Sequence, residues 1–268
     1  MRSRGFTLVE LVMVIVIMGI MATSITIFLK PAIDSFFDSR RRADLTDMAD
    51  TALRRMGQDI RSAVSNSVRS VSASCFQLVP TITGGRYRMA PDTVTAGSTY
   101  IDTSTASTAF DALSPLSQVP ATGDWVVIDN QNTNDVYAGT NRAVVTGITT
   151  PSPGSFGQHR ITFANTQFPI GYDGGRFVVV PNVETTVFYS CSNGILYRGT
   201  TNGFATVDTT TCGAGGAIVA TDVASCTFVY DPSHGATQQN GFVWMRLELS
   251  RSGESIMLSQ GVHVDNVP

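Results

Sequence analysis

The chain has 268 residues, of which 43% are hydrophobic and 15% are charged, and its formal net charge at pH 7 is −3. This composition excludes an intrinsically disordered chain, which combines weak hydrophobicity with strong net charge. It also provides no overall basic field that would recruit nucleic acid. It suits a β-rich extracytoplasmic domain with one membrane segment, and the length is enough for one large domain or two small ones.

The first distinctive segment is an apolar run over residues 11–29 that contains no charged residue. A helix needs about 20 residues to cross the hydrocarbon core of a bilayer, so this run is long enough. A cleaved secretory signal peptide is disfavoured, because bulky Ile20 and Met21 occupy positions before Thr23 where small residues are needed. An ordinary membrane anchor leaves Glu10 unexplained, because a lone carboxylate inside hydrocarbon is costly.

The residues around Glu10 offer an explanation. The segment GFTLVE at residues 5–10, preceded by Arg2 and Arg4, resembles the type IV prepilin cleavage site. The resemblance implies that prepilin peptidase cuts between Gly5 and Phe6 and N-methylates Phe6, while the apolar helix stays on the mature protein. It also implies that Glu10 of one subunit neutralises the new Phe6 amino group of its neighbour, since a buried charge is tolerable only when it is paired.

Positive charges alone do not decide the orientation in the membrane, because Lys30 and the arginines at residues 40–42 lie beyond the apolar run. The cleavage motif instead places residues 1–5 in the cytoplasm as a leader. It predicts a single-pass inner-membrane protein that is later built into a pilus or pseudopilus. Residues 6–29 would form the transmembrane and filament-core helix, and the C-terminal head would lie in the periplasm.

Residues 30–66 are predicted to continue the helix outside the membrane. Pro31 interrupts the two halves and is able to kink the helix, since it removes a backbone donor, and Gly57 weakens the helix by about 1 kcal/mol. Asp50 and Arg54 form a favourable i,i+4 pair. The apolar residues follow the spacing of an amphipathic helix, and the rest of the chain must supply the surface that covers them. They are Leu45, Met48, Ala49, Ala52, Leu53, Met56, Ile60 and Val64.

Past residue 70 the hydrophobic periodicity falls to two, which predicts strands. The expected strands are residues 76–79, 125–129, 143–148, 160–163, 177–180, 185–191, 195–198, 226–230, 242–249 and 255–264. Turn signals such as Asn193-Gly194 and Ser252-Gly253 separate them. Strands that follow one long helix predict an α+β fold, in which residues 67–268 form an antiparallel head on the helical stripe. Residues 92–123, rich in Thr, Ser and Ala, are expected to form a surface loop or a poorly ordered insertion.

Four cysteines lie in this head: Cys75, Cys191, Cys212 and Cys226. None forms a CxxC pair and the three histidines are distant in sequence, so no zinc site is expected. An even number in a membrane-anchored chain predicts two disulfides in an oxidising compartment, with free buried thiols as the alternative. Of the three connectivities we favour Cys191–Cys212 with Cys75–Cys226, which closes one local hairpin loop and one long loop.

Four further sequence segments indicate which pilin-like proteins this chain resembles. They are residues 51–69 (TALRRMGQDIRSAVSNSVR), 75–80 (CFQLVP), 85–88 (GRYR) and 187–199 (VFYSCSNGILYRG). These resemble the MshO family of MSHA pilus biogenesis proteins, and are similar to the J-type pseudopilins of type II secretion and the PilW-like minor pilins. The resemblance implies a structural minor subunit of a tip complex that primes assembly. Its implied partners are prepilin peptidase, other minor and major pilins or pseudopilins, the inner membrane and its assembly platform.

No enzymatic signature accompanies these features, since HExxH, GxSxG and P-loop patterns are absent. Residues 213–218 resemble a dinucleotide loop only superficially, because Ile218 stands where the third glycine belongs. We therefore expect no catalytic residue, no cofactor and no metal, and a structural protein rather than an enzyme.

Two further functions stay open at this stage. The head of a secretion subunit would contact exported substrate. Alternatively, Arg86, Tyr87 and Arg88 interleave positive charge with an aromatic ring, as in a single-stranded nucleic-acid or adhesive tip. A strand with solvated arginines is the simpler interpretation of this trio, and nucleic acid is not an expected partner.

Overall fold

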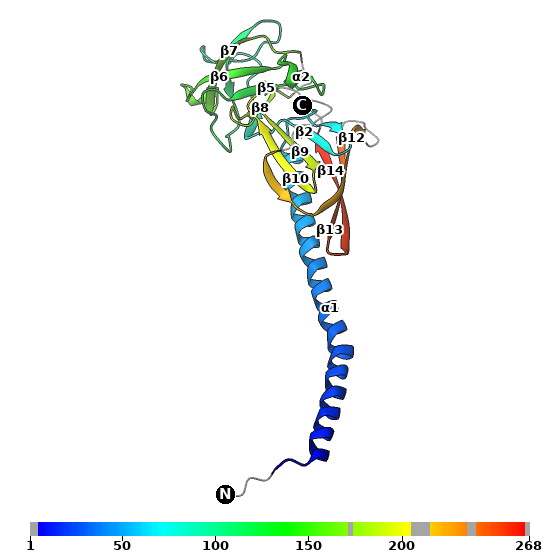
Figure 1. The fold of residues 1–268 in the computed structure, drawn as a ribbon. Helices are drawn as coiled ribbons and strands as arrows, with labels where there is room; N and C mark the ends of the chain where they lie inside the picture. The colour runs from blue at the N-terminus through cyan, green and yellow to red at the C-terminus, as the bar shows by residue number, and fades with distance from the viewer. Residues whose placement is uncertain (1–4, 171–173, 205–214, 235–239, 266–268) are drawn as a thin grey trace, which may run out of the picture.

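The computed structural model describes residues 5–170, 174–204, 215–234 and 240–265. Figure 1 shows a helical stalk whose N-terminal half projects freely, with a β-rich head around and beyond its other end. The helices are α1 (Leu8–Arg61) and the short α2 (Asp135–Ala138), and Gly154–Phe156 form a 3-10 turn. The strands are β1 (Arg69–Ser72), β2 (Cys75–Leu78), β3 (Thr83–Arg86), β4 (Ser107–Ala112), β5 (Trp125–Ile128), β6 (Arg142–Thr149), β7 (His159–Thr166), β8 (Arg176–Val180), β9 (Thr186–Ser192), β10 (Ile195–Thr201), β11 (Ala217–Ala220), β12 (Val223–His234), β13 (Asn240–Arg251) and β14 (Glu254–Asp265). The predicted α+β fold is confirmed.

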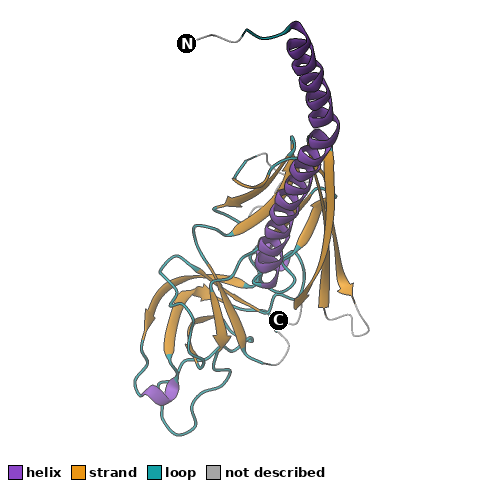
Figure 2. Cartoon of the chain, turned by 90° about the horizontal axis from the view of Figure 1, so that it is seen from below, coloured by secondary structure: helices purple, strands orange, loops and turns teal. Residues whose placement is uncertain are grey.

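The second half of α1 is held by two antiparallel sheets. One sheet has the strand order β1-β2-β9-β10-β11 and the other has the order β12-β13-β14. Figure 2 shows strands on both sides of this part of the helix. Phe76, Tyr189, Phe228 and Met245 of the sheets form one hydrophobic core with the helical stripe. The buried helical residues are Leu45, Ala49, Ala52, Leu53, Met56, Gly57 and Ile60, which confirms the predicted apolar face.

The helix ends at Arg61, not near residue 66 as predicted. The Ser62 N–H donates to the Gln58 carbonyl at 3.1 Å, and the Val64 N–H then donates to the Val79 carbonyl at 2.8 Å. A pairing with the end of β2 thus replaces the last helical hydrogen bonds, so the backbone groups stay satisfied. The hydrophobic periodicity could not reveal this helix end, because the Val64 side chain fits the helical spacing. Periodicity does not show that the Val64 backbone pairs with Val79.

Each expected strand is present, with ends that move by a few residues. Both predicted hairpin turns also form, because Asn193 and Gly194 have φ angles of 52° and 76° and Ser252 and Gly253 have 51° and 85°. Two successive positive φ angles match the twist of a hairpin. The sequence prediction missed the strands β1, β3, β4 and β11, because their residues do not alternate between apolar and polar side chains.

A second hydrophobic core lies in a lobe formed within residues 83–180, between β2 and β9 in the chain. Its antiparallel sheet has the order β3-β8-β5-β6-β7-β4. The two outer strands approach each other, because Tyr87 bridges to Ala112 and the Leu113 N–H donates to the Arg86 carbonyl at 2.7 Å. The sheet therefore curves into a nearly closed barrel. Figure 1 shows this barrel lobe beyond the end of α1.

The loop expected over residues 92–123 is only partly correct, because β4 lies inside it. Phe110 of β4 is fully buried in the barrel core, and buried Asp111 forms an ion pair with Arg160 of β7 at 2.7 Å. The Thr99 N–H and hydroxyl also donate to the Asp111 carboxylate. The sequence did not predict this strand, because it has no pattern of alternating apolar residues. Buried Phe110 and the ion pair with Arg160 stabilise it instead.

Candidate assembly segment at the N-terminus

The junction where cleavage is expected is extended and exposed. Gly5, Phe6 and Thr7 precede the helix and none of them is buried, with Phe6 78% exposed. Thr7 is the N-cap residue of α1, with an extended backbone, and its side chain accepts a hydrogen bond from the Glu10 N–H at 3.3 Å. Threonine is a favourable N-cap because its oxygen satisfies one of the free N–H groups of the first turn. The helix therefore begins just after the Gly5–Phe6 bond, which stays accessible.

Glu10 lies in the first turn of α1, where its negative charge is favourable beside the positive end of the helix dipole. Its side chain is exposed, and within the described part of the chain its carboxylate has no ion pair. Phe6 lies before the N-cap residue Thr7, and Glu10 lies in the first turn of the helix that follows. The partner expected for Glu10 belongs to a neighbouring subunit, so this expectation stays a prediction.

The apolar shaft that follows is built to lie in a non-aqueous environment. Every residue from 8 to 29 is exposed in the isolated chain, and this helix is long and apolar enough to cross a membrane. Its hydroxyl groups are satisfied internally, because those of Thr23, Ser24 and Thr26 donate to the carbonyls of Gly19, Ile20 and Ala22 at 2.6–2.9 Å. Internal pairing of this kind is what lipid requires of polar side chains and backbone. The shaft thus needs other apolar surfaces around it.

A single helix, α1, runs from the apolar shaft into the head. α1 continues through Pro31 without a break, so this proline does not end the helix. Near the point where the shaft meets the head, Arg42 forms an ion pair with Glu254 at the hairpin between β13 and β14, at 2.8 Å. Arg42 is not part of the apolar stripe, so this ion pair supplements the hydrophobic packing of α1 against the head.

A polar network that the sequence analysis missed fixes the end of α1 to the head. The Asp59 carboxylate accepts hydrogen bonds from the Tyr189 hydroxyl at 2.8 Å and from the Arg198 guanidinium at 2.7 Å. Arg198 also forms an ion pair with Glu184 at 2.6 Å. Burial raises the pKa of the Tyr189 hydroxyl, and the neighbouring Asp59 carboxylate raises it further. Burial lowers the pKa of Arg198, but the carboxylates of Asp59 and Glu184 outweigh this effect and raise it.

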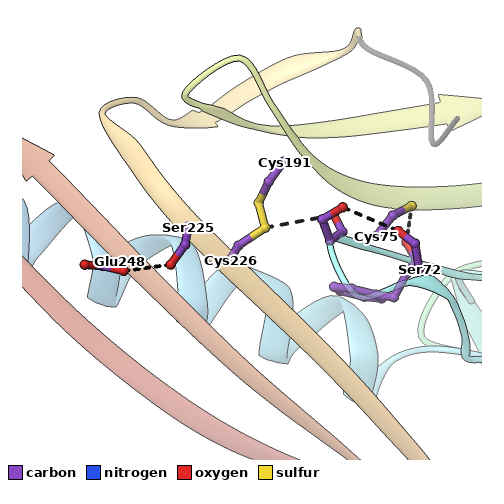
Figure 3. Close-up of a disulfide and its surroundings, with 8 residues drawn as sticks. Ser72, Cys75, Cys191, Ser225, Cys226 and Glu248 are labelled. Carbon is purple, nitrogen blue, oxygen red and sulfur yellow. Dashed lines mark hydrogen bonds between the residues drawn. A yellow bond between two sulfur atoms is a disulfide. The ribbon is translucent and has the colours of Figure 1, made fainter.

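The disulfide expected from the cysteines is present, but the favoured pairing is wrong. Cys191 of β9 and Cys226 of β12 form a disulfide, with their Cα atoms 6.5 Å apart (Figure 3). Ser74 lies beside both, because its carbonyl accepts from the Cys191 N–H at 3.1 Å and lies 3.9 Å from the Cys226 sulfur. The bond therefore joins the two sheets that hold α1, which loop closure along the chain does not indicate. Cys75 is also disulfide-bonded, and Cys212 lies outside the described residues.

The trio at residues 86–88 does not form a stacking surface for nucleic acid. Tyr87 is buried in the barrel core, with its ring 5.5 Å from that of Phe110. The Arg88 guanidinium donates to the carbonyls of Ser155 and Phe156 at 3.1–3.2 Å, so it is held within the lobe. Arg86 alone of the three is exposed. Base stacking needs an accessible ring, and this ring is covered.

Within the described ranges, no three His, Cys, Asp or Glu side chains group in a way that would hold a metal ion. The candidate dinucleotide loop begins outside the described residues, and from Ala217 onward the chain enters strand β11. A dinucleotide loop instead leads into a helix that binds the pyrophosphate.

The comparisons with known proteins agree with the N-terminal geometry. Residues 1–26 match the family described as the prokaryotic N-terminal methylation motif. No curated protein and no solved structure matches the chain significantly. The matched residues contain the exposed Gly5–Phe6 bond, Glu10 and most of the apolar shaft. The chain therefore carries a type IV pilin-like prepilin signal on an α+β fold of the type IV pilin-like kind.

Proposed function

We propose that this chain is a minor pilin or pseudopilin, with a structural role in starting and assembling a type IV, MSHA-like pilus. The observation that carries the proposal is the methylation motif at residues 1–26, which continues directly into an exposed apolar helix. Prepilin peptidase cleaves between Gly5 and Phe6 and N-methylates Phe6. Residues 6–29 then serve first as a transmembrane anchor in the inner membrane and later as part of the filament core.

Glu10 provides the register of assembly in this proposal. Cleavage creates a positive α-amino group on Phe6, and the apolar shaft offers no partner for it. In a dry filament core, the Glu10 carboxylate of one subunit and the Phe6 amine of its neighbour are costly alone and tolerable together. Because apolar contacts between shafts are unspecific, this pair selects how far one helix slides along another.

Residues 30–66 and the head at 67–268 lie in the periplasm in this proposal. A disulfide between Cys191 and Cys226 is compatible with that oxidising compartment. The partners are prepilin peptidase, the other minor and major pilins, and the inner-membrane assembly platform.

A J-type minor pseudopilin of type II secretion is the alternative, because the same signal and fold serve both systems. The position of the barrel lobe supports this alternative. The lobe extends beyond the end of α1 (Figure 1), where we propose that it would contact an exported substrate. A deletion strain separates the two functions: loss of surface pili with normal secretion supports the pilus, and the reverse supports secretion.

The assembly role is tested by complementing that deletion with Glu10→Ala. We expect the precursor to be made and cleaved, while filaments or secretion fail because the Phe6 amine lacks its partner. Glu10→Asp is the matched control, since it keeps the charge and should restore part of the assembly. Normal assembly by Glu10→Ala would sink the role that we assign to this carboxylate.

Processing is tested separately by mass spectrometry of the native protein. We expect an N-terminus at Phe6 that carries the mass of one added methyl group. A native chain that begins at Met1, or past Ala22, would contradict the prepilin assignment whatever the assembly phenotype.

A further inference from the structure

A pocket of about 360 Å³ lies where the barrel lobe meets the segment after α1. Its lining includes the half-buried Val178 of β8 together with Val64 and Val127 of β5, which are buried in the neighbouring core. The segment after α1 is tied to the barrel, because the Asn130 side chain donates to the Ser65 carbonyl at 2.6 Å. The Asn66 side chain donates in turn to the Asn130 carbonyl at 2.8 Å. The pocket is therefore a fixed feature of the junction.

Gly84, which lines this pocket, lets β3 approach β8 closely. A Cβ atom at Gly84 would lie 2.8 Å from the Phe177 carbonyl oxygen and 3.1 Å from a methyl group of Val178. The first distance is shorter than real Cβ contacts, so a side chain there would push the strand pair apart. The strand pair at this edge of the pocket therefore requires glycine at position 84.

Two arginines stand at the edge of this space. Arg86 of β3 and Arg176 of β8 are direct cross-strand partners, both exposed, and both line the pocket. Within the described residues, neither guanidinium has a carboxylate partner or a hydrogen bond, although Asp129 lines the same pocket. Like charges directly opposite each other destabilise an antiparallel pair. Such an arrangement fits a site that an anion completes, because guanidinium groups bind carboxylates with paired hydrogen bonds.

We propose that this pocket binds a short peptide segment of a partner protein, with a carboxylate between Arg86 and Arg176 and an apolar side chain against Val178. A free inorganic anion would leave the apolar lining uncovered. A lipid headgroup is out of reach, because the helical residues 30–61 alone separate the pocket from the apolar shaft by about 50 Å at 1.5 Å per residue. The inference goes beyond the pilin role, and it does not depend on cleavage or filament assembly.

The test uses the full chain in detergent micelles and a fluorescein-labelled hexapeptide in which leucine and glutamate alternate. Fluorescence anisotropy is measured against empty micelles. We expect Arg86→Gln and Arg176→Gln each to raise the peptide Kd about tenfold or more, since each removes a charge-assisted contact. Arg55→Gln is the matched control, because Arg55 is an exposed arginine of α1 outside the pocket. It should leave the Kd unchanged.

Two altered peptides and one thermal measurement complete the test. Replacing glutamate by glutamine should abolish binding, and replacing leucine by glycine should weaken it. Without peptide, Arg86→Gln should melt at the same temperature as the native chain or higher, because it relieves the repulsion from Arg176. Equal binding of the glutamine peptide, an equal effect of Arg55→Gln, or inorganic phosphate binding as tightly as the peptide would overturn the proposal.

Discussion

The network around Asp59 predicts that this side chain adds measurably to the packing that holds α1 against the head. Replacing Asp59 by alanine removes two hydrogen bonds to a charged acceptor, one from Tyr189 and one from Arg198. Hydrogen bonds of this kind contribute about 1.5–3 kcal/mol each. The matched change is Asp50→Ala on the same helix, where an exposed carboxylate pairs with Arg54 at 2.6 Å.

The expected magnitude follows from what each variant leaves behind. In Asp59→Ala, Arg198 keeps its ion pair with Glu184. The variant therefore avoids the larger free-energy cost of a buried charge without a partner. The Tyr189 hydroxyl loses its acceptor, and alanine regains about 0.5 kcal/mol of helix propensity. We therefore expect Asp59→Ala to lower the free energy of unfolding by about 3 kcal/mol. An exposed i,i+4 pair contributes about 0.3–0.5 kcal/mol, so Asp50→Ala should cost no more than that.

Thermal unfolding of the full chain in detergent measures the difference. Trp244 lies on β13, on the face of the strand opposite the core residues Val243 and Met245, so its fluorescence reports the unfolding of the sheet that packs on α1. Trp125 lies in the barrel lobe, and a Trp125→Phe background removes its signal. A loss of about 3 kcal/mol corresponds to a fall in Tm of about 6–12 °C for a domain of this size. Equal effects of Asp59→Ala and Asp50→Ala, or a loss below about 1 kcal/mol for the former, would refute this account.

Three further predictions concern other contacts that only the folded chain makes. Gly57→Leu should destabilise the chain by about 1–3 kcal/mol in urea unfolding, because even an added Cβ atom at Gly57 would lie only 3.2 Å from a methyl group of Val262 in β14. An unchanged midpoint would contradict this close packing. Burial raises the pKa of Asp111, but hydrogen bonds from Arg160 and Thr99 outweigh it and lower the pKa, so stability that is present above about pH 4 should be lost as the pH falls further. Asp111→Asn should flatten that loss in thermal melts from pH 5 to pH 2, and an unchanged acid profile would contradict the assignment. Cys226→Ser opens a disulfide that spans 35 residues and should cost about 3 kcal/mol, measured against the native chain without reductant; retention of full stability would show that packing alone holds the two sheets together.

Much of the fold could be predicted because it depends on neighbours in the sequence. The apolar stripe from Leu45 to Ile60 repeats with the helical period, and each of its members that the structure buries faces the head. Asn193-Gly194 adopts the positive φ angles that its hairpin needs. These features arise from local backbone preference and side-chain spacing, so a single chain segment carries enough information to identify them.

The barrel lobe could be predicted only in pieces. Its apolar strands were expected individually, but β3 and β4 were not, and nothing indicated that Tyr87 would bridge to Ala112. Barrel closure depends on the register and tilt of every strand together. A run of Thr and Ser around Phe110 therefore looks like a loop until the strands on either side of it are in place.

By itself the sequence determined the N-terminal signal, the apolar shaft, the amphipathic stripe and the positions of the long strands. Only the tertiary structure decided that Cys191 pairs with Cys226, that Asp59 meets Arg198, and that Arg86 and Arg176 become cross-strand partners. The physical reason is that spacing encodes what a segment buries, whereas a contact between distant residues depends on which strands become neighbours and in which register.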